Sequence, residues 1–127
     1  MMEQGAELFG STYRRGEVVF RQGDTGDAMY IIQSGAVEVS QLSKGRETVI
    51  AILEKGAMVG EGAFIDSGPR SNDVIAMEPS RLLVLSAPKM EELILNNPLL
   101  AVKLMKRMLF IMSLRLRKAG DRISELL

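Results

Sequence analysis

Short runs of β-branched and aromatic residues, broken every several residues by Gly, Asp or Ser, fill the chain from Glu17 to about Ser86. Antiparallel strands can be joined by tight turns, whereas parallel strands need long and usually helical crossovers. The short interruptions leave no room for crossovers, so the pattern predicts a mainly β, antiparallel sandwich or barrel. The expected strands are Val18–Phe20, Met29–Ile32, Val37–Val39, Thr48–Leu53, Val74–Ala76 and Leu82–Leu85, with hairpin turns at Ser34-Gly35 and Lys44-Gly45.

After Pro88 the apolar residues follow the period of a helix. A short helix is expected from Lys89 to Leu95 and a long one from Leu99 to Leu127, separated by Asn96-Asn97-Pro98. A chain of 127 residues has the usual size of one domain. We therefore expect a single domain over residues 1–127, with its β part at about 12–87 and its C-terminal helices at about 88–127.

The long helix carries two apolar stripes. The first, here called the seam, alternates spacings of four and three residues and consists of Met105, Leu109, Met112, Leu116, Ala119, Ile123 and Leu126. The second consists of Leu104, Met108, Ile111 and Leu114. We expect one stripe to pack on the β part and the seam to pair with a second copy of the chain, which gives a homodimer. The alternative is that both stripes pack internally.

The chain contains neither Cys nor His. Their absence removes disulfides, the usual zinc, copper and non-haem iron ligand sets, and the Ser-His-Asp and Cys-His triads. We therefore expect no catalytic residues, no metal site and no enzymatic activity. The first residues lack the basic and apolar regions of a signal peptide, and the most apolar stretch, Met108 to Leu114, is too short to span a bilayer. These features predict a cytoplasmic protein with no membrane span.

Two segments carry the functional signal. The first, from Val19 to Gly35, reads VFRQGDTGDAMYIIQSG, and its glycines fit turns or close backbone approach. The second, from Val59 to Ala76, reads VGEGAFIDSGPRSNDVIA. Both resemble the cyclic-nucleotide-binding domain family, which is shared by regulatory subunits of protein kinase A, nucleotide-gated channels and the effector domain of the catabolite activator protein. The resemblance covers essentially the whole chain.

The resemblance implies an antiparallel β-roll, which is a double-stranded β-helix of the jelly-roll or cupin-like kind, with a short N-terminal helix and a long C-terminal helix. Its second segment resembles the phosphate-binding cassette of the family, where backbone N–H groups, a helix N-terminus and one arginine hold a cyclic phosphate. Arg70 falls on the arginine position, and Glu61 falls on the glutamate that accepts the ribose 2′-hydroxyl. The expected ligand-binding residues are Gly60, Glu61, Gly62, Ala63, Arg70, Ser71 and Asn72.

Some residues depart from the family pattern. Asn72 stands where the family usually has a small residue. Asp66 and Asp73 add negative charge near a site meant for an anion, and like charge disfavours binding unless it is paired. Asp73, three residues from Arg70, is a candidate to compete with the phosphate for that arginine. Asn72 and Asp73 are the best support for the alternative of a degenerate, ligand-free dimerisation scaffold.

On the long helix, the sequence offers no hydroxyl side chain at the place where such groups would hydrogen-bond the base of the nucleotide. In the catabolite activator protein, hydroxyl side chains on the long helix bond the adenine, and Ala119 and Gly120 stand in the similar place here. Neither side chain can form a hydrogen bond. Ser71 is a candidate for the guanine amino group, and Arg117, Lys118 or Arg122 for stacking on the base. We therefore expect cAMP and cGMP to bind with similar affinity.

The expected function is that of a regulatory module that senses cAMP or cGMP without any further cofactor and signals through its C-terminal helix. A cupin-type metalloenzyme shares the broad architecture, but the lack of His disfavours it. The sequence stops at Leu127 without a DNA-recognition helix. We therefore expect no direct DNA binding and an output through an unidentified effector protein, unless the sequence is a fragment of a longer protein.

Overall fold

The computed structural model describes residues 9–126, apart from the side chains of Phe9, Asp66, Ala119 and residues 121–126. The chain divides into two compact units, Met1–Met90 and Glu91–Leu127. The short N-terminal helix that the resemblance implied lies outside the described residues, because strand β1 is the first element that they contain.

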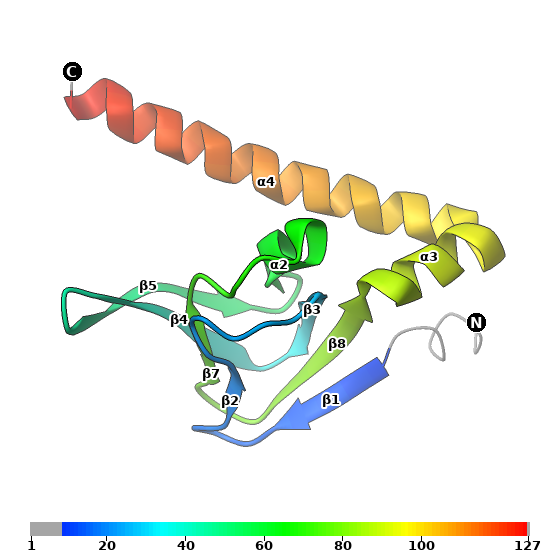
Figure 1. Ribbon diagram of the computed structural model, residues 1–127, viewed down its shortest axis with the longest axis horizontal. Coiled ribbons are helices and arrows are strands. Elements are labelled where there is room, and N and C mark those ends of the chain that lie inside the picture. The colour runs from blue at the N-terminus through cyan, green and yellow to red at the C-terminus, as the bar shows by residue number, and fades with distance from the viewer. Residues whose placement is uncertain (1–8, 127) are drawn as a thin grey trace. The chain divides into compact units, whose positions relative to one another are not determined.

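The described residues of the first unit contain two four-stranded antiparallel sheets, the short helix α2 (Glu61–Asp66) and the start of α3 (Ala87–Asn96) (Figure 1). In one sheet the order is β1 (Phe9–Tyr13), β8 (Ser80–Ser86), β3 (Ala28–Ser34) and β6 (Met58–Val59). In the other it is β2 (Val18–Phe20), β7 (Asp73–Ala76), β4 (Ala36–Ser43) and β5 (Arg46–Glu54). Helix α2 (Glu61–Asp66) lies between β6 and β7 in the chain. The alternation of the chain between sheets confirms the predicted antiparallel β-roll.

All the predicted strands are present, but β1 and β6 were not predicted. Strand β1 begins at Phe9, slightly before the start that we expected for the β part at about residue 12. Strand β1 pairs with β8 from Phe9↔Val84 to Tyr13↔Ser80, and β6 pairs with β3 at Tyr30↔Val59 and Ile31↔Met58.

Both sheets contribute to one apolar core. The buried residues of this core are Phe20, Ile32, Val37, Val39, Val59, Val74 and Leu82. They come from strands of both sheets, so the core joins the sheets face to face. Strands β2, β3 and β7 each contribute a residue to this core and are therefore fixed by apolar burial.

Both predicted turns have positive φ, but only Lys44-Gly45 closes a hairpin; Ser34-Gly35 joins strands of different sheets, so the hairpin expected there was wrong. Gly35, between β3 and β4, has φ +88°, and a Cβ there would overlap Ser80 Oγ and lie 2.6 Å from the carbonyl oxygen of Pro79. In the β4–β5 hairpin, Lys44 and Gly45 have φ of 54° and 75° between the paired residues Ser43 and Arg46. Positive φ at both central residues is the geometry that suits the twist of a two-residue hairpin.

Helix α3 (Ala87–Asn96) and helix α4 (Pro98–Leu126) follow, close to the predicted bounds. The backbone N–H of Leu100 donates to Asn97 Oδ1 at 3.3 Å, so Asn97 caps α4 and Pro98 is its first residue. Within the second unit, Leu109 and Leu116 of the seam are 66% and 74% exposed. Of the helices in the described part of the chain, none is long and apolar enough to cross a membrane.

Candidate functional site

Arg70 is the one charged side chain that is buried among the described residues, with 6% of its surface exposed. Burial of a guanidinium removes its hydration and is costly unless polar or ionic partners replace the water. Arg70 follows α2 and precedes β7, so it stands in the segment that the sequence assigned to phosphate binding.

The partners of this guanidinium are a carbonyl group and aromatic rings. Arg70 Nη1 donates to the carbonyl oxygen of Gly60 at 3.2 Å. Its Cζ lies 4.3 Å from the ring centroid of Phe20 and 5.8 Å from that of Tyr30, which is cation–π geometry. Among the described side chains, no carboxylate forms an ion pair with Arg70. These contacts therefore hold the guanidinium in place, but no described acidic side chain neutralises its positive charge.

The backbone of Arg70 is also fixed. Its N–H donates to the carbonyl oxygen of Asp24 at 2.9 Å, and its own carbonyl oxygen accepts from the N–H of Gly23 at 2.8 Å. Gly23 and Asp24 belong to the loop between β2 and β3. Two hydrogen bonds to this loop therefore fix the position of the Arg70 backbone in the site.

Helix α2 begins beside the guanidinium. Its N-cap, Gly60, has φ +79°, a left-handed conformation that favours glycine, and the intrahelical bond from Phe64 N–H to Gly60 O measures 3.2 Å. The first N–H groups of any helix lack acceptors inside the helix and carry partial positive charge. Because Arg70 Nη1 donates to the carbonyl oxygen of the N-cap residue Gly60, the positive charge of the guanidinium lies next to the partial positive charge of the first helical N–H groups.

The structure brings together some of the predicted site residues and separates others. Gly60 and Arg70 are in direct contact. Glu61 is the first residue of α2, Ala63 is buried, and a Cβ on Gly62 would meet open space. Asn72 Nδ2 donates to Ser71 Oγ at 3.0 Å, so these two side chains bond each other just before β7.

Sequence reasoning missed the role of two neighbours of Arg70. Phe20 was expected only as a strand residue, yet its ring supports the guanidinium. Gly26 was expected to allow close approach, and the structure shows to what: a Cβ on Gly26 would lie 3.0 Å from Arg70 Nη2. No sequence signal links these residues to Arg70, because the contacts depend on how the strands come together.

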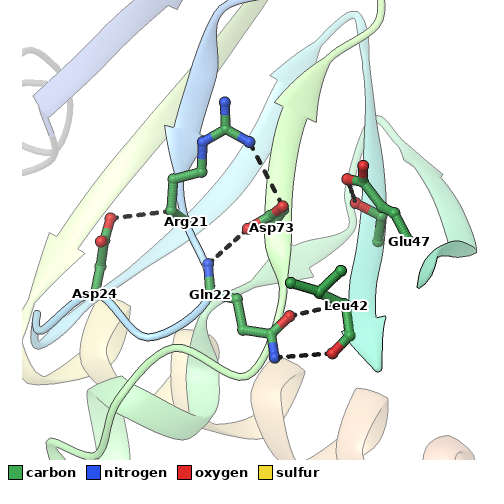
Figure 2. A network of polar contacts seen from close by, with 7 residues as sticks. Arg21, Gln22, Asp24, Leu42, Glu47 and Asp73 are labelled. Atoms are coloured by element: carbon green, nitrogen blue, oxygen red, sulfur yellow. Dashed lines mark hydrogen bonds and ion pairs between the residues drawn. The ribbon is translucent and has the colours of Figure 1, made fainter. Parts of the chain in front are cut away.

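The expectation that Asp73 competes for Arg70 was wrong. Its carboxylate accepts from the N–H of Gln22 at 2.7 Å and pairs with Arg21 Nη1 at 3.5 Å (Figure 2). The negative charge of Asp73 is therefore compensated by Arg21 rather than by the cassette arginine. In the described part of the chain, no group of three or more acidic side chains is arranged to hold a metal ion.

Residues 11–97 match the sequence profile of the family described as "Cyclic nucleotide-binding domain". Since these residues make up more than half of the chain, the chain belongs to that family. The match confirms the resemblance drawn from the two sequence segments.

Similar proteins include regulators from several sources. The "Cyclic AMP receptor protein" of Thermus thermophilus is 37% identical over 90 residues, which cover 70% of this chain and 42% of that protein. The "cAMP-dependent protein kinase regulatory subunit" of Dictyostelium discoideum is 30% identical over 98 residues, which cover 76% of this chain and 30% of that protein. The chain spans about half or less of the length of the curated relatives named first.

Solved structures show the same fold. A cyclic nucleotide-binding domain from Methylobacillus flagellatus has a TM-score of 0.85 at 29% identity and covers 98% of this chain and 71% of that one. The Thermus thermophilus catabolite activator protein has a TM-score of 0.82 at 31% identity, covering 95% and 55%. The chain is therefore a regulatory domain of the cyclic nucleotide-binding family.

Proposed function

We propose that the chain binds cAMP or cGMP as its regulatory ligand, without a further cofactor. Arg70 and the backbone of the α2 start hold the cyclic phosphate, and Glu61 accepts the ribose 2′-hydroxyl. Gly60, Gly62 and Ala63 let the backbone approach the ligand, while Ser71 and Asn72 complete the edge of the site.

One observation carries the proposal: Arg70 is buried at the N-terminus of α2, with no counter-charge among the described side chains. A buried guanidinium has lost its hydration, so a phosphate that enters beside it gains charge-assisted hydrogen bonds at little further desolvation cost for the protein. A planar guanidinium can bond two phosphate oxygens at once. The family of the chain binds ligands of this chemistry.

The alternative of a ligand-free scaffold depended on Asn72 and Asp73. Asp73 is paired with Arg21, and the amide of Asn72 bonds the neighbouring Ser71. Neither residue takes the hydrogen-bonding capacity of Arg70. The contacts therefore favour a binding-competent cassette over a degenerate one.

The output of the module is also part of the proposal. We expect a cytoplasmic homodimer that pairs through the seam of α4 and passes its signal to an effector protein, with no DNA contact by this chain. A ligand shifts such an equilibrium only by its differential affinity for the two arrangements of the helix. The exposed side chains of Leu109 and Leu116 support pairing through the seam.

Calorimetric titration with cAMP and with cGMP tests the proposal on three proteins: the wild type, Arg70→Ala and the matched control Arg46→Ala. Arg46 lies at the exposed end of the β4–β5 hairpin. Loss of Arg70 leaves the phosphate without its counter-charge, and we expect a cost on the order of 2 to 5 kcal/mol. Arg46→Ala should bind as the wild type does. Binding by Arg70→Ala within about threefold of wild type, well below the tenfold that 1.4 kcal/mol represents, would show that Arg70 does not hold the ligand.

A further inference from the structure

We propose that Asp73 is a positioning residue for Arg70. Asp73 fixes the loop formed by residues 21–24, and this loop holds the backbone of Arg70 in the position from which its guanidinium contacts the phosphate. The inference rests on the proposed function. It reverses the role that the sequence suggested for Asp73, from a charge that opposes the anion to a support for the residue that binds it.

The first step is the contact of Asp73 with the loop. One carboxylate oxygen accepts from the backbone N–H of Gln22 at 2.7 Å, and the other lies 3.5 Å from Arg21 Nη1. The Asp73 side chain is only 13% exposed, so water competes weakly for these contacts. Figure 2 shows the carboxylate of Asp73 between these two residues. A single side chain thus bonds two consecutive residues of the loop.

The second step is the stiffness of the loop itself. The N–H of Arg21 donates to Asp24 Oδ2 at 3.0 Å, and the N–H of Asp24 donates to the carbonyl oxygen of Arg21 at 3.1 Å. The Gln22 carboxamide bonds the backbone of Leu42 twice: Leu42 N–H donates to Oε1 at 2.9 Å, and Nε2 donates to Leu42 O at 3.3 Å (Figure 2). The loop is therefore a closed turn anchored to β4 on one side and to Asp73 on the other.

The third step is the transfer of this stiffness to Arg70. The N–H of Gly23 donates to Arg70 O at 2.8 Å, and the N–H of Arg70 donates to Asp24 O at 2.9 Å. Both bonds come from the closed turn. A displacement of Gln22 would move Gly23 and Asp24 and, with them, the backbone of Arg70. Groups that bind a ligand must be held within about 0.5 Å of their productive geometry, so a small shift lowers affinity.

Positioning and repulsion predict opposite signs. If Asp73 acted mainly as a negative charge near the anion, its removal would strengthen nucleotide binding. If it positions Arg70, its removal weakens binding. Asp73→Asn separates the contributions, because the amide oxygen still accepts from Gln22 N–H while the charge is lost.

The experiment measures cAMP and cGMP affinity by calorimetry for wild type, Asp73→Ala, Asp73→Asn and the control Glu47→Ala. Glu47 is an acidic residue of β5, a strand that pairs with β4 and not with β7, and its carboxylate accepts from Ser40 Oγ at 3.0 Å rather than from a residue of the loop. We expect Asp73→Ala to weaken binding about tenfold, which corresponds to a lost hydrogen bond to a charged group. Asp73→Asn should stay within about threefold of wild type, and Glu47→Ala should not weaken binding.

A second measurement is independent of the ligand. Amide hydrogen exchange at Gly23 and Arg70 reports the two bonds between the turn and the cassette. We expect faster exchange at both amides in Asp73→Ala than in wild type, and little change in Glu47→Ala. Arg21→Met, which removes only the ion pair and leaves the bond to Gln22 N–H, should show a smaller effect and serves if Asp73→Ala fails to fold.

The outcomes separate the two proposals. A wild type that binds no cyclic nucleotide, or an Arg70→Ala variant that binds as well as wild type, overturns the proposed function, and the exchange data then decide alone whether Asp73 holds the turn. Wild-type binding that Arg70→Ala abolishes and Asp73→Ala leaves unchanged or strengthens overturns the positioning role. Unchanged exchange at Gly23 and Arg70 in Asp73→Ala also overturns it.

Discussion

Arg70 approaches Gly60 so closely that a methyl group on Gly60 would lie 2.7 Å from Arg70 Nη1. The same methyl group would lie 3.2 Å from the carbonyl oxygen of Ala28 and 3.3 Å from Cε2 of Phe20. Two constraints therefore coincide at Gly60, because its φ of +79° also disfavours any residue with a Cβ. Both the N-cap conformation of α2 and the space that the Arg70 guanidinium occupies therefore require glycine at position 60.

Gly60→Ala should destabilise the unliganded protein and weaken nucleotide binding. The left-handed backbone alone costs an alanine about 1 to 2 kcal/mol, and the contact with Arg70 adds to this cost. Chemical denaturation without ligand measures the change in the free energy of unfolding. Gly62→Ala is the stability control, because its Cβ would meet open space in a helical backbone, where alanine is favoured by up to about 1 kcal/mol. Equal stability of the two variants would contradict the crowding at Gly60.

Gly35→Ala should be among the most destabilising glycine substitutions in the β-roll. Its Cβ would lie 2.6 Å from Pro79 O and 2.7 Å from Ser80 Cα, which are backbone atoms that cannot turn away. We expect a loss of about 3 kcal/mol or more, from overpacking and positive φ together. Gly45→Ala has positive φ but an unobstructed Cβ, so it should lose only about 1 to 2 kcal/mol. Thermal unfolding of both variants checks the difference, and a similar loss for both would refute the steric argument.

Leu116→Glu should disperse the proposed homodimer. Leu116 is 74% exposed within its unit and stands in the middle of the seam, so a glutamate would place a charge in the apolar contact between two copies. Leu95→Glu is the matched control, because Leu95 is 83% exposed on α3 and lies outside the seam. Light scattering at micromolar concentration should report a dimer for wild type and Leu95→Glu and a monomer for Leu116→Glu. A monomeric wild type would rule out pairing through the seam.

Affinities for cAMP and cGMP should differ by less than about tenfold, or 1.4 kcal/mol. Strong rejection of a near-isostere requires buried polar groups that the wrong ligand leaves unpaired. Gly120 is exposed and offers no side chain that could bond a base. Side-by-side titrations at one salt concentration measure the ratio. A hundredfold preference would reveal a base contact from another residue.

The strands that the sequence predicted are those with several consecutive apolar residues, such as β5 and β8. Strand β1 was missed because Phe9–Tyr13 contains Gly and Ser and shows no clear alternation. Strand β6 was missed because a period cannot be read from the two residues Met58–Val59. Pairing with a longer neighbour, β8 or β3, defines each of them.

For the site, the sequence indicated the segment and its arginine, because backbone-mediated phosphate binding depends on glycine and arginine at local spacing. The supports of Arg70 come from elsewhere in the chain. Asp73 and Gln22 are 51 residues apart, and their bond depends on the pairing of β2 with β7, which local spacing does not encode. The charge of Asp73 was read correctly, but its partner could not be inferred without that pairing.

The two hydrogen bonds between the Gln22 carboxamide and the Leu42 backbone have a further consequence for solubility. Strand β4 pairs with β7 only from Val37 to Ser40, so beyond Ser40 this side of β4 is no longer covered by β7. There the carboxamide of Gln22 donates to and accepts from the backbone of Leu42 as a peptide group of an adjoining strand would. Unpaired strand edges with apolar side chains are templates for edge-to-edge aggregation, and Leu42 is itself exposed. The Gln22 side chain thus occupies the backbone N–H and C=O of Leu42, so these groups are not free to pair with a strand of a second chain.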